Sequence, residues 1–297
     1  MPGRALLLVN SKARRGQEDL SQIRERLSSG GLELIEPRGE SGDWSELIRR
    51  HHREADLIVL GGGDGTINRA LGGLLEAQLP LGILPLGTAN DLARTLALPS
   101  DPVAACEVIL SGHIQRIDVG RVNDRPFLNV ASVGLAVDVT RRLSQGAKSR
   151  WGVLAYLWAA IAALVRGHSF AVEICCDGER LRTRTWQVAV GNGRNYGGGL
   201  TIHQEARIDD GLLDLYSVEV QRGWHILLLI PALWRGALDP VHTVRTLRGT
   251  RFEIRPLRRP RSITADGELV GQTPAIFELK RQALSVYVPA PLENESQ

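Results

Sequence analysis

The sequence predicts an α/β N-terminal domain with a parallel, doubly wound sheet, followed by a largely antiparallel β domain. Two observations support this fold class. Up to about residue 112, short apolar β-branched runs alternate with segments whose apolar spacing suits one helix face. Beyond that point, strand-like runs follow one another around turn signals. We expect residues 1–120 to form the first domain, 121–290 the second, and 291–297 a polar tail.

The elements of the first domain are expected to alternate along the chain. The strands are predicted at residues 4–9, 32–35, 56–60 and 81–84. Helical patterns cover residues 17–27 and 68–75, and a further helix runs through Trp44, Leu47 and Ile48, with Ser41 or Asp43 as its cap.

The second domain is expected to consist mainly of strands. Residues 113–123 and 127–133 are predicted to pair around the turn at Asn123-Asp124-Arg125-Pro126. Residues 171–176 and 180–190 flank Asp177-Gly178, a strong hairpin signal. Further strands are predicted at 212–220, 251–255, 275–279 and 283–288, with helices inserted at 151–165 and 224–235.

A glycine-rich turn, Gly61-Gly62-Gly63-Asp64-Gly65-Thr66, connects the third predicted strand to a helix. This geometry aims free backbone N–H groups at a phosphate, and glycine lets the backbone approach an anion closely. Asp64 beside a polyphosphate would be repelled, which indicates a divalent cation between them. The alternative is a tight connection without a ligand.

A second turn, Pro85-Leu86-Gly87-Thr88-Ala89-Asn90-Asp91-Leu92, follows the next predicted strand. Because the carboxyl ends of parallel strands meet at one edge of the sheet, both turns should face one crevice. Two common phosphate motifs are excluded. The first turn has no Walker lysine, and a dinucleotide fingerprint starting at Gly61 would need glycine at Thr66.

The composition narrows the partners. With 297 residues, 43% of them hydrophobic, the chain can bury a core in two domains. The net charge of +3 comes mostly from arginine, which suits phosphate or an anionic membrane surface, although an arginine-rich background would look the same. No basic stripe with interleaved aromatic residues argues for nucleic acid.

The cysteines and the apolar runs indicate a cytoplasmic protein. Cys106, Cys175 and Cys176 are odd in number and lack metal-ligand spacing, which suits a reducing compartment. No signal peptide is expected. The longest apolar run, residues 151–165, is too short to span a bilayer, so it predicts a buried helix or a surface that touches a membrane.

Several short stretches together resemble a known family. They are residues 61–66, 85–94, 206–214 and 265–268, with 116–120 and 191–199 between them. In this order they resemble the diacylglycerol kinase catalytic-domain family, and most closely its stand-alone bacterial lipid kinases, which are related to sphingosine and ceramide kinases. The resemblance covers nearly the whole chain.

The resemblance implies an enzyme that phosphorylates a lipid hydroxyl with ATP and Mg²⁺. It implies an α/β first domain, a β-sandwich second domain and an active site between them, the plan shared by NAD kinases and diacylglycerol kinases. The resemblance implies nucleotide contacts at the first and second glycine turns. A further nucleotide contact, at the end of the first strand, is left open. These residues are Gly62, Gly63, Asp64, Gly65, Thr66, Ile67 and Asn68, then Gly87, Thr88 and Asn90, and lastly Asn10.

The resemblance also assigns the acidic residues. An active-site Mg²⁺ is implied at Asp64, Asp91 and Asp118, and a separate Mg²⁺ site at Asp210 with the backbone carbonyls of Arg207 and Leu212. The general base is implied in Asp266-Gly267-Glu268, with Glu268 as the first choice and Asp266 as the second. Taken without the family, Asp118 could be a strand-end capping carboxylate, and Asp210 and Asp266 turn residues.

The sequence departs from the family pattern in two places. The first turn is Asn10-Ser11-Lys12-Ala13 with its glycine delayed to Gly16, and Arg38 stands where the family often has a threonine near adenine. Nucleotide contacts by Asn10 and Arg38 are therefore left open, and the apolar lipid pocket does not identify the lipid.

Two other functions are considered. An NAD kinase-like enzyme would share the Gly-Gly-Asp-Gly-Thr turn, but residues 87–94 favour a lipid kinase. A catalytically silent lipid- or nucleotide-binding regulator is the other, and the intact acidic set argues against it. The expected partners are ATP and a lipid at a membrane surface, without nucleic acid. The protein is expected in the cytoplasm, peripheral to the inner face of the membrane, and a homodimer is left open.

Overall fold

The computed structural model describes residues 3–10, 20–37, 43–135, 137, 168–193, 195–196, 200–201, 206–220 and 243–290. The chain divides into two compact units, Met1–Ile117 with Gln282–Gln297, and Asp118–Arg281. The expected boundary at residue 120 lies close to this division, whereas residues 282–290 group with the first unit. The helices expected at 151–165 and 224–235, the candidate cap Ser41 and the residues Lys12 and Arg38 lie outside the described residues.

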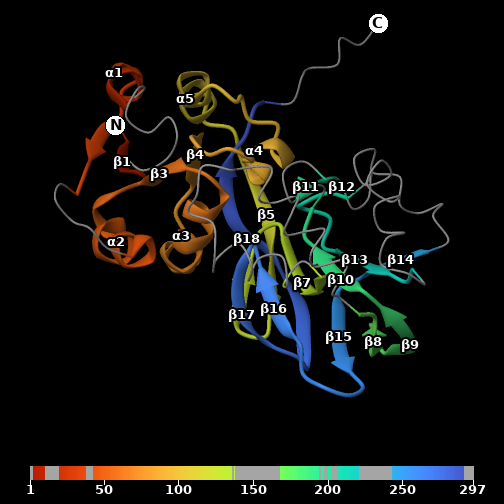
Figure 1. The fold of residues 1–297 in the computed structure, drawn as a ribbon. Helices are drawn as coiled ribbons and strands as arrows, with labels where there is room; N and C mark the ends of the chain where they lie inside the picture. The colour runs from red at the N-terminus through yellow and green to blue at the C-terminus, as the bar shows by residue number, and fades with distance from the viewer. Residues whose placement is uncertain are drawn as a thin grey trace, which may run out of the picture. The chain divides into compact units, whose positions relative to one another are not determined.

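The first unit contains a parallel sheet with the strand order β2-β1-β3-β4 (Figure 1). Its strands are β1 (Arg4–Val9), β2 (Glu33–Ile35), β3 (Leu57–Gly62) and β4 (Leu81–Pro85). The order changes direction between β1 and β3, because β2 lies on one side of β1 and the later strands lie on the other. Ligands of doubly wound sheets bind at such a switch point, outside the carboxyl ends of the strands.

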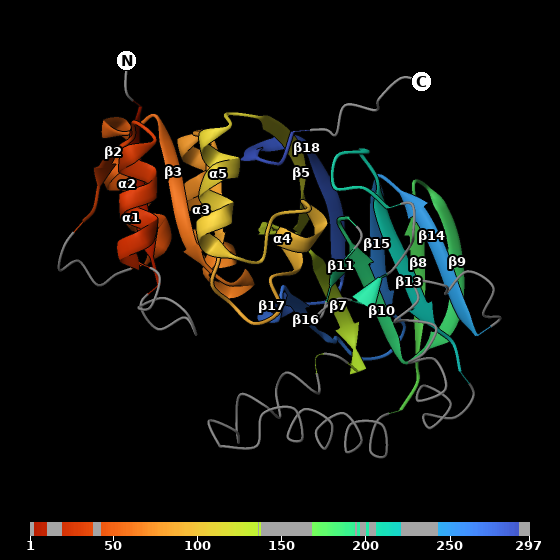
Figure 2. The same cartoon turned by 90° about the horizontal axis from the view of Figure 1, so that it is seen from above.

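Helices cover both faces of this sheet (Figures 1 and 2). On one face lie α1 (Leu20–Ser29) and α5 (Pro102–Leu110), and on the other lie α2 (Trp44–His51) and α3 (Asp64–Ala77). The helices α1 and α5 contribute Ile23, Leu27 and Cys106 to a buried cluster with apolar strand residues. The predicted doubly wound fold is therefore confirmed for this unit.

Helix caps explain where two of these helices begin. The carboxylate of Asp43 accepts the N–H of Ser45 at 3.1 Å, so the predicted cap of α2 is confirmed. The helix α5 was not predicted, although Asp101 caps it by accepting the N–H of Ala104 at 2.8 Å and Pro102 opens its first turn. The short elements η1 (His52–Glu54) and α4 (Asp91–Thr95) complete the helices of the described residues.

The second unit contains two antiparallel sheets. The first has the order β14-β13-β10-β7-β16-β17. The second is the antiparallel part of the ten-stranded sheet that also contains β2, β1, β3 and β4, and it joins β18, β15, β8 and β9, with β5 beside β18 and β6. The bounds of the first sheet are β7 (Val130–Gly134), β10 (Gln187–Gly191), β13 (Leu213–Val218), β14 (Val244–Gly249), β16 (Ser262–Ala265) and β17 (Glu268–Gln272). Those of the second are β5 (Ile114–Val122), β6 (Arg125–Phe127), β8 (Phe170–Cys176), β9 (Glu179–Thr185), β15 (Arg251–Pro256) and β18 (Ala275–Tyr287). A small ladder joins β11 (Asn195–Tyr196) and β12 (Leu200–Thr201).

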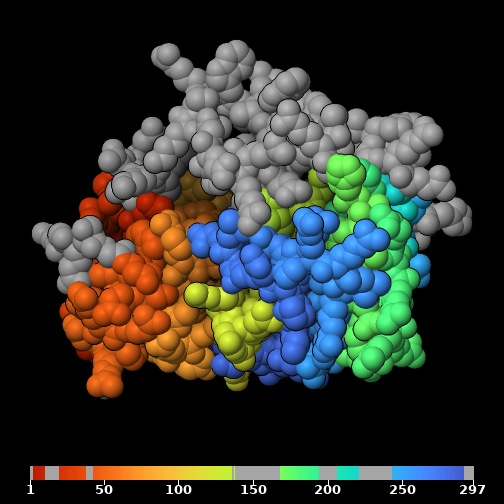
Figure 3. Space-filling model, turned by 60° about the horizontal axis from the view of Figure 1, so that its bottom comes forward, coloured from red at the N-terminus to blue at the C-terminus, as the bar shows by residue number. Residues whose placement is uncertain are grey.

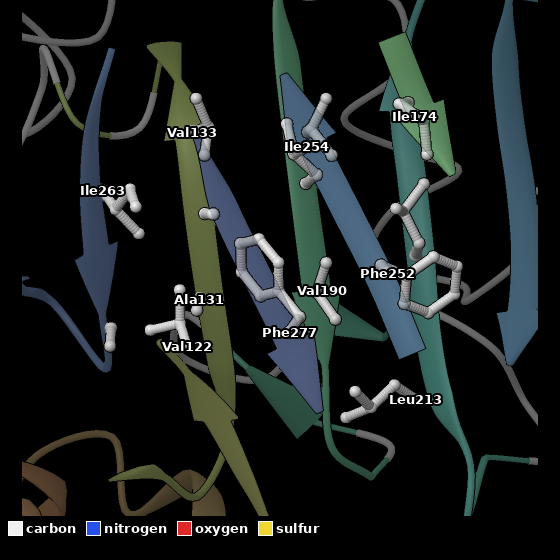
Figure 4. Packing of buried hydrophobic residues seen from close by; sticks show 14 of the residues in the cluster. Val122, Ala131, Val133, Ile174, Val190, Leu213, Phe252, Ile254, Ile263 and Phe277 are labelled. Atoms are coloured by element: carbon white, nitrogen blue, oxygen red, sulfur yellow. The ribbon is translucent and has the colours of Figure 1, made fainter. Parts of the chain in front are cut away.

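The core of the second unit lies between the two sheets (Figure 4). Val133, Val190 and Leu213 come from one sheet, and Phe252 and Phe277 from the other. On the surface in Figure 3, blue residues of β15 and its neighbours adjoin green residues of the β8–β9 hairpin, as the pairing of β15 with β8 requires. Packing of two sheets face to face confirms the predicted β-sandwich.

Two predicted strands are each divided in the structure. Residues 127–133 separate into β6, which pairs with β5, and β7, which pairs with β10 and β16. Residues 180–190 separate at Trp186, whose N–H bonds to the carbonyl of Val218 at 2.8 Å. The prediction of one strand at each place was wrong. At both breaks the backbone N–H groups donate to residues distant in sequence and not to a neighbouring strand of the predicted ladder.

Two further predicted strands, 275–279 and 283–288, are one continuous strand, β18. The strand passes through Gln282, which has a φ of +47°, and the guanidinium of Arg116 donates to the carbonyl of Gln282 at 2.7 and 3.1 Å. The strand is therefore irregular at this point. The polar residues 280–282 looked like a loop in the sequence, so two separate strands were predicted.

Candidate active site

The glycine turn after β3 leads directly into α3, as predicted. Gly63 caps the helix, and its carbonyl accepts the N–H groups of Thr66 and Ile67 at 2.8 and 3.2 Å. The N–H groups of Asp64 and Gly65 precede these and point out of the first helical turn, where a helix leaves its donors open. A Cβ added at Gly65 would meet no atom within 4 Å. The start of α3 is therefore open to an anion.

The second glycine turn lies against the first. A Cβ on Gly87 would stand 2.5 Å from the Cα of Gly63, and a Cβ on Gly63 would stand 3.0 Å from the Cα of Gly87. The N–H of Leu86 donates to the carbonyl of Gly62 at 3.0 Å. Glycine is required at both positions because the two backbones touch, so the structure brings the two predicted turns together.

Asn90 shapes the second turn from within. It has a φ of +51°, and its amide accepts the N–H of Gly87 and donates to the carbonyl of Gly87, both at 3.1 Å. Asparagine tolerates this left-handed conformation better than most residues. The side chain of Asn90 thus holds the loop that precedes α4.

Asn10, which follows β1, borders the same turns. Its backbone N–H donates to the carbonyl of Gly61 at 2.9 Å, and its amide Nδ2 donates to Thr66 Oγ1 at 3.0 Å. Asn10 and the glycine turn therefore lie at the switch point between β1 and β3. Thr66 is buried and closes the space beneath Gly62, where an added Cβ would be 2.5 Å from the Thr66 side chain.

Asp64 connects the two turns. One of its carboxylate oxygens, Oδ1, accepts the N–H of Leu92 at 3.1 Å. Within the described residues, no hydrogen bond or ion pair engages the other oxygen, Oδ2. Asp91, at the start of α4, is buried next to Leu92. An oxygen donor beside open backbone N–H groups fits a Mg²⁺ ion that bridges to phosphate.

A pocket of about 480 Å³ opens at the second turn. It is lined by residues 87–90, by Arg94 and by residues 98–100. Arg94 is exposed and, among the described residues, has no ion-pair partner. A guanidinium next to backbone donors gives this pocket a positive lining that suits a phosphate group.

In the second unit, Asp118 is almost completely buried on β5. Its Oδ2 accepts the N–H of Gly211 at 2.8 Å, and its N–H donates to the carbonyl of Ile208 at 2.8 Å. Its carbonyl accepts Nδ2 of Asn192 at 2.9 Å, and the same Nδ2 lies 3.1 Å from the carbonyl of Leu128. Asn192 was not predicted as a site residue, although it lies in the Gly191-Asn192-Gly193 stretch that supported the resemblance.

The loop from Arg207 to Leu212, where the resemblance implies a second Mg²⁺, is closed by its own hydrogen bonds. Asp210 Oδ2 accepts the N–H of Arg207 at 3.3 Å, and Oδ1 accepts the N–H of Leu212 at 2.9 Å. Arg248, which the sequence did not single out, donates to Asp210 Oδ2 at 2.7 Å. These three donors occupy most of the acceptor sites of the carboxylate, so a metal ion would compete with them for Asp210.

Asp266 and Glu268 differ sharply in their surroundings. The carboxylate of Asp266 accepts three backbone N–H groups, from Leu128 at 2.8 Å, Asn129 at 2.9 Å and Val130 at 3.0 Å. Asp266 and Gly267 have φ values of +45° and +84° and form the two-residue turn between β16 and β17. Glu268 follows the turn, is exposed, and has no hydrogen bond or ion pair to any described residue.

Two other kinds of site are absent from the described residues. No group of three or more His, Cys, Asp or Glu side chains is close enough together to hold a metal ion in that part of the chain. None of the helices described is both long enough and apolar enough to cross a membrane.

Comparisons with known proteins agree with this geometry. The model of the family described as "Diacylglycerol kinase catalytic domain" matches residues 4–122. The model of the "YegS C-terminal NAD kinase beta sandwich-like domain" matches residues 129–288. The fold and these two matches define a two-domain kinase, and the chain belongs to the diacylglycerol kinase family.

Relatives and solved structures match over almost the whole chain. A protein of Pseudomonas putida named "Probable lipid kinase YegS-like" is 30% identical, with 98% of this chain and 97% of the relative covered. A diacylglycerol kinase of Mycobacterium tuberculosis is 32% identical, with 89% and 87% covered. A solved structure of a Bacillus anthracis protein is 26% identical, covers 97% and 98%, and superposes with a TM-score of 0.81. The prediction of a lipid kinase-type enzyme is confirmed at the level of the family.

Proposed function

We propose that this chain transfers the γ-phosphate of ATP to the hydroxyl of a lipid such as diacylglycerol, with Mg²⁺ as the cofactor. The observation that carries the proposal is the contact between Gly63 and Gly87 at the carboxyl ends of β3 and β4. Because both residues are glycines, no side chain fills the space beside the open start of α3. This space can accommodate a chain of phosphates. The family membership supplies the class of reaction.

Asp64, Asp91 and Asp118 are proposed to serve an active-site Mg²⁺ that binds together with ATP, since no three such carboxylates of the described residues lie close enough to hold a metal ion by themselves. Asp64 fits this role because one of its oxygens is engaged by Leu92 and the other faces no partner in the described part of the chain. When bound, Mg²⁺ would neutralise the charge that develops on the transferring phosphoryl group. The chain's own part is to orient the phosphates with the N–H groups of Asp64 and Gly65 and with Arg94.

Glu268 is proposed as the general base that accepts the proton of the lipid hydroxyl. Its carboxylate is free of hydrogen bonds to the described residues, so its lone pairs are open to a substrate. Asp266 is proposed to position Glu268 instead, because three backbone N–H groups already occupy its carboxylate. These contacts favour Glu268 over Asp266 as the base, which is the order that the resemblance implied.

The test is a transfer assay with radiolabelled ATP and Mg²⁺. Purified protein is offered diacylglycerol and sphingosine in mixed micelles and, separately, NAD in solution. Label in a lipid, lost in Glu268→Gln, is the expected result. Label in NAD alone would indicate the NAD kinase-like alternative. No label in any acceptor, with ATP still bound, would indicate a regulator.

We further infer that catalysis takes place at a membrane or micelle surface, because diacylglycerol-type substrates partition into lipid. The protein is then peripheral to a membrane, and the arginine-derived net charge of +3 suits anionic lipid. Rates should therefore rise with the surface concentration of lipid. Equal rates on a monomeric, water-soluble substrate would contradict this inference.

A further inference from the structure

Arg248 bridges two aspartates in the second unit. It stands on β14 directly opposite Asp214 on β13, in antiparallel register. Its Nε lies 3.0 Å from Asp214 Oδ1, and its Nη2 lies 2.7 Å from Asp210 Oδ2. Asp214 is 2% exposed, so its carboxylate depends on a nearby cation. A planar guanidinium with several donors suits two carboxylates at once.

The same arginine reaches the loop that the resemblance assigns to a second Mg²⁺. The carboxylate of Asp210 receives Arg248 together with the backbone N–H groups of Arg207 and Leu212. The neighbouring Asp209 is paired with the Arg207 guanidinium at 2.9 Å. The positive charge that a metal would bring to Asp210 is therefore already supplied by a side chain.

This loop in turn holds Asp118. The N–H of Gly211 donates to Asp118 Oδ2 at 2.8 Å, and the carbonyl of Ile208 accepts the N–H of Asp118 at 2.8 Å. Gly211 has a φ of +73°, and a Cβ at this position would lie 2.7 Å from the guanidinium of Arg281. The backbone at Gly211 thus has little freedom. Because Gly211 directly follows Asp210 and donates to Asp118, a displacement of Asp210 would also move the hydrogen-bond donor of Asp118.

We propose that Arg248 is the resident cation of the 207–212 loop and a positioning residue for Asp118. It takes the place that the resemblance gives to a second Mg²⁺, and a divalent ion would have to compete with it for the Asp210 carboxylate. The structural part of the proposal stands on the contacts within the second unit. Only the consequence for catalysis rests on the proposed function, through the role of Asp118.

The first test measures thermal stability without nucleotide, in EDTA and over a titration of Mg²⁺ or Ca²⁺. Wild type should show the same Tm throughout. Arg248→Gln should lower the Tm in EDTA by roughly 5–15 °C, because an aspartate pair loses its cation. Added divalent ion should restore much of that loss, since it can then occupy the vacated carboxylates.

The matched control is Arg245→Gln, on the same strand. Arg245 pairs with Glu219 at 2.9 Å, outside the loop, so this variant should change the Tm by no more than about 2 °C and show no divalent response. Arg248→Lys should fall between wild type and Arg248→Gln, and it keeps the test readable if Arg248→Gln does not fold. Asp210→Asn combined with Arg248→Gln should abolish the divalent response that Arg248→Gln shows alone.

The second test is kinetic. Arg248→Gln in EDTA-treated protein, assayed at a Mg²⁺ level that saturates ATP only, should lose about tenfold or more in kcat while the KM for ATP stays within about threefold. Excess Mg²⁺ or Arg248→Lys should recover part of kcat. A merely structural contact would not show recovery of both Tm and kcat by a divalent ion.

Two results would overturn the proposal. One is a wild-type Tm that rises with Mg²⁺ and loses this rise in Asp210→Asn, because a metal would then be the resident cation. The other is an Arg248→Gln variant as stable as Arg245→Gln in EDTA. The thermal test needs no kinase activity, so a failure of the proposed lipid phosphorylation leaves it fully interpretable.

Discussion

At the scale of single residues, the candidate site separates side chains that hold the backbone from side chains that face outward. Asp266 accepts three N–H groups from the segment between β6 and β7, whereas Glu268, two residues later, has no partner among the described residues. Both are acidic residues in one short motif, in which the resemblance ranked Glu268 before Asp266 as the general base. The difference depends on N–H donors that are more than 130 residues away.

Glu268→Gln tests the outward-facing carboxylate. We expect kcat to fall by roughly 10²–10⁴, because the lipid hydroxyl loses its proton acceptor. ATP affinity and Tm should not change, since Glu268 is exposed and makes no contact that the exchange removes. Steady-state kinetics and a melting curve measure these effects, with Glu278→Gln, an exposed glutamate on β18, as the control. Wild-type rates in Glu268→Gln would rule out this assignment.

Asp266→Ala tests the inward-facing carboxylate. Removing an acceptor of three backbone N–H groups should cost about 1–3 kcal/mol in the free energy of unfolding. Asp266→Asn should cost less, because its amide oxygen still accepts. Urea titrations measure the stability, and activity should fall in step with it. An Asp266→Ala variant of full stability and no activity would indicate that Asp266 is the base.

At the scale of elements, the sequence predicted the first unit well. Its strands alternate with amphipathic helices, so local periodicity carries the information. The second unit was predicted less accurately, since β6 and β7 are separated by the carboxylate of Asp266, and β9 and β10 by the carbonyl of Val218. Such breaks depend on hydrogen-bond partners that are distant in sequence, so no local sequence pattern predicts them.

The hairpin of β8 and β9 was predicted from Asp177-Gly178, and its aspartate does more than form the turn. Asp177 accepts the N–H groups of Thr250 and Arg251 at 3.0 and 2.9 Å, which ties the hairpin to β15. Desolvation raises the pKa of Asp177, but the hydrogen bonds from Thr250 and Arg251 outweigh it and leave the pKa below its ordinary value. A lowered pKa in the folded state stabilises the protein above the pKa of the unfolded state.

Asp177→Asn should therefore lower the free energy of unfolding by about 1 kcal/mol or less near pH 7, because Asp177 is exposed and solvent screens its charge. The difference from wild type should shrink as the pH falls below about 4, where the unfolded aspartate is already protonated. Urea titrations at several pH values measure this trend. A difference that grows as the pH falls would contradict it.

At the scale of the whole molecule, the proposed reaction uses a phosphate site at the doubly wound sheet and a base from the β-sandwich. The family and the fold class could be predicted from the sequence, because the motifs run in order along nearly the whole chain. The sequence predicted that the two glycine turns lie at one edge of the sheet, but it did not predict the contact of Gly63 with Gly87. Arg248 and Asn192 were missed, because their roles arise from cross-strand pairing and from backbone groups of other strands.

The most direct test of the phosphate cradle is the affinity of Gly65→Ala for Mg²⁺-ATP. A methyl group at Gly65 meets no atom within 4 Å, and alanine favours a helix, so the variant should fold with an unchanged or slightly higher Tm. The methyl would stand beside the N–H that is proposed to contact a phosphate. We predict an affinity at least about tenfold weaker than wild type, equivalent to about 1.4 kcal/mol. An unchanged affinity in the folded variant would contradict the claim that ATP phosphates bind at the start of α3.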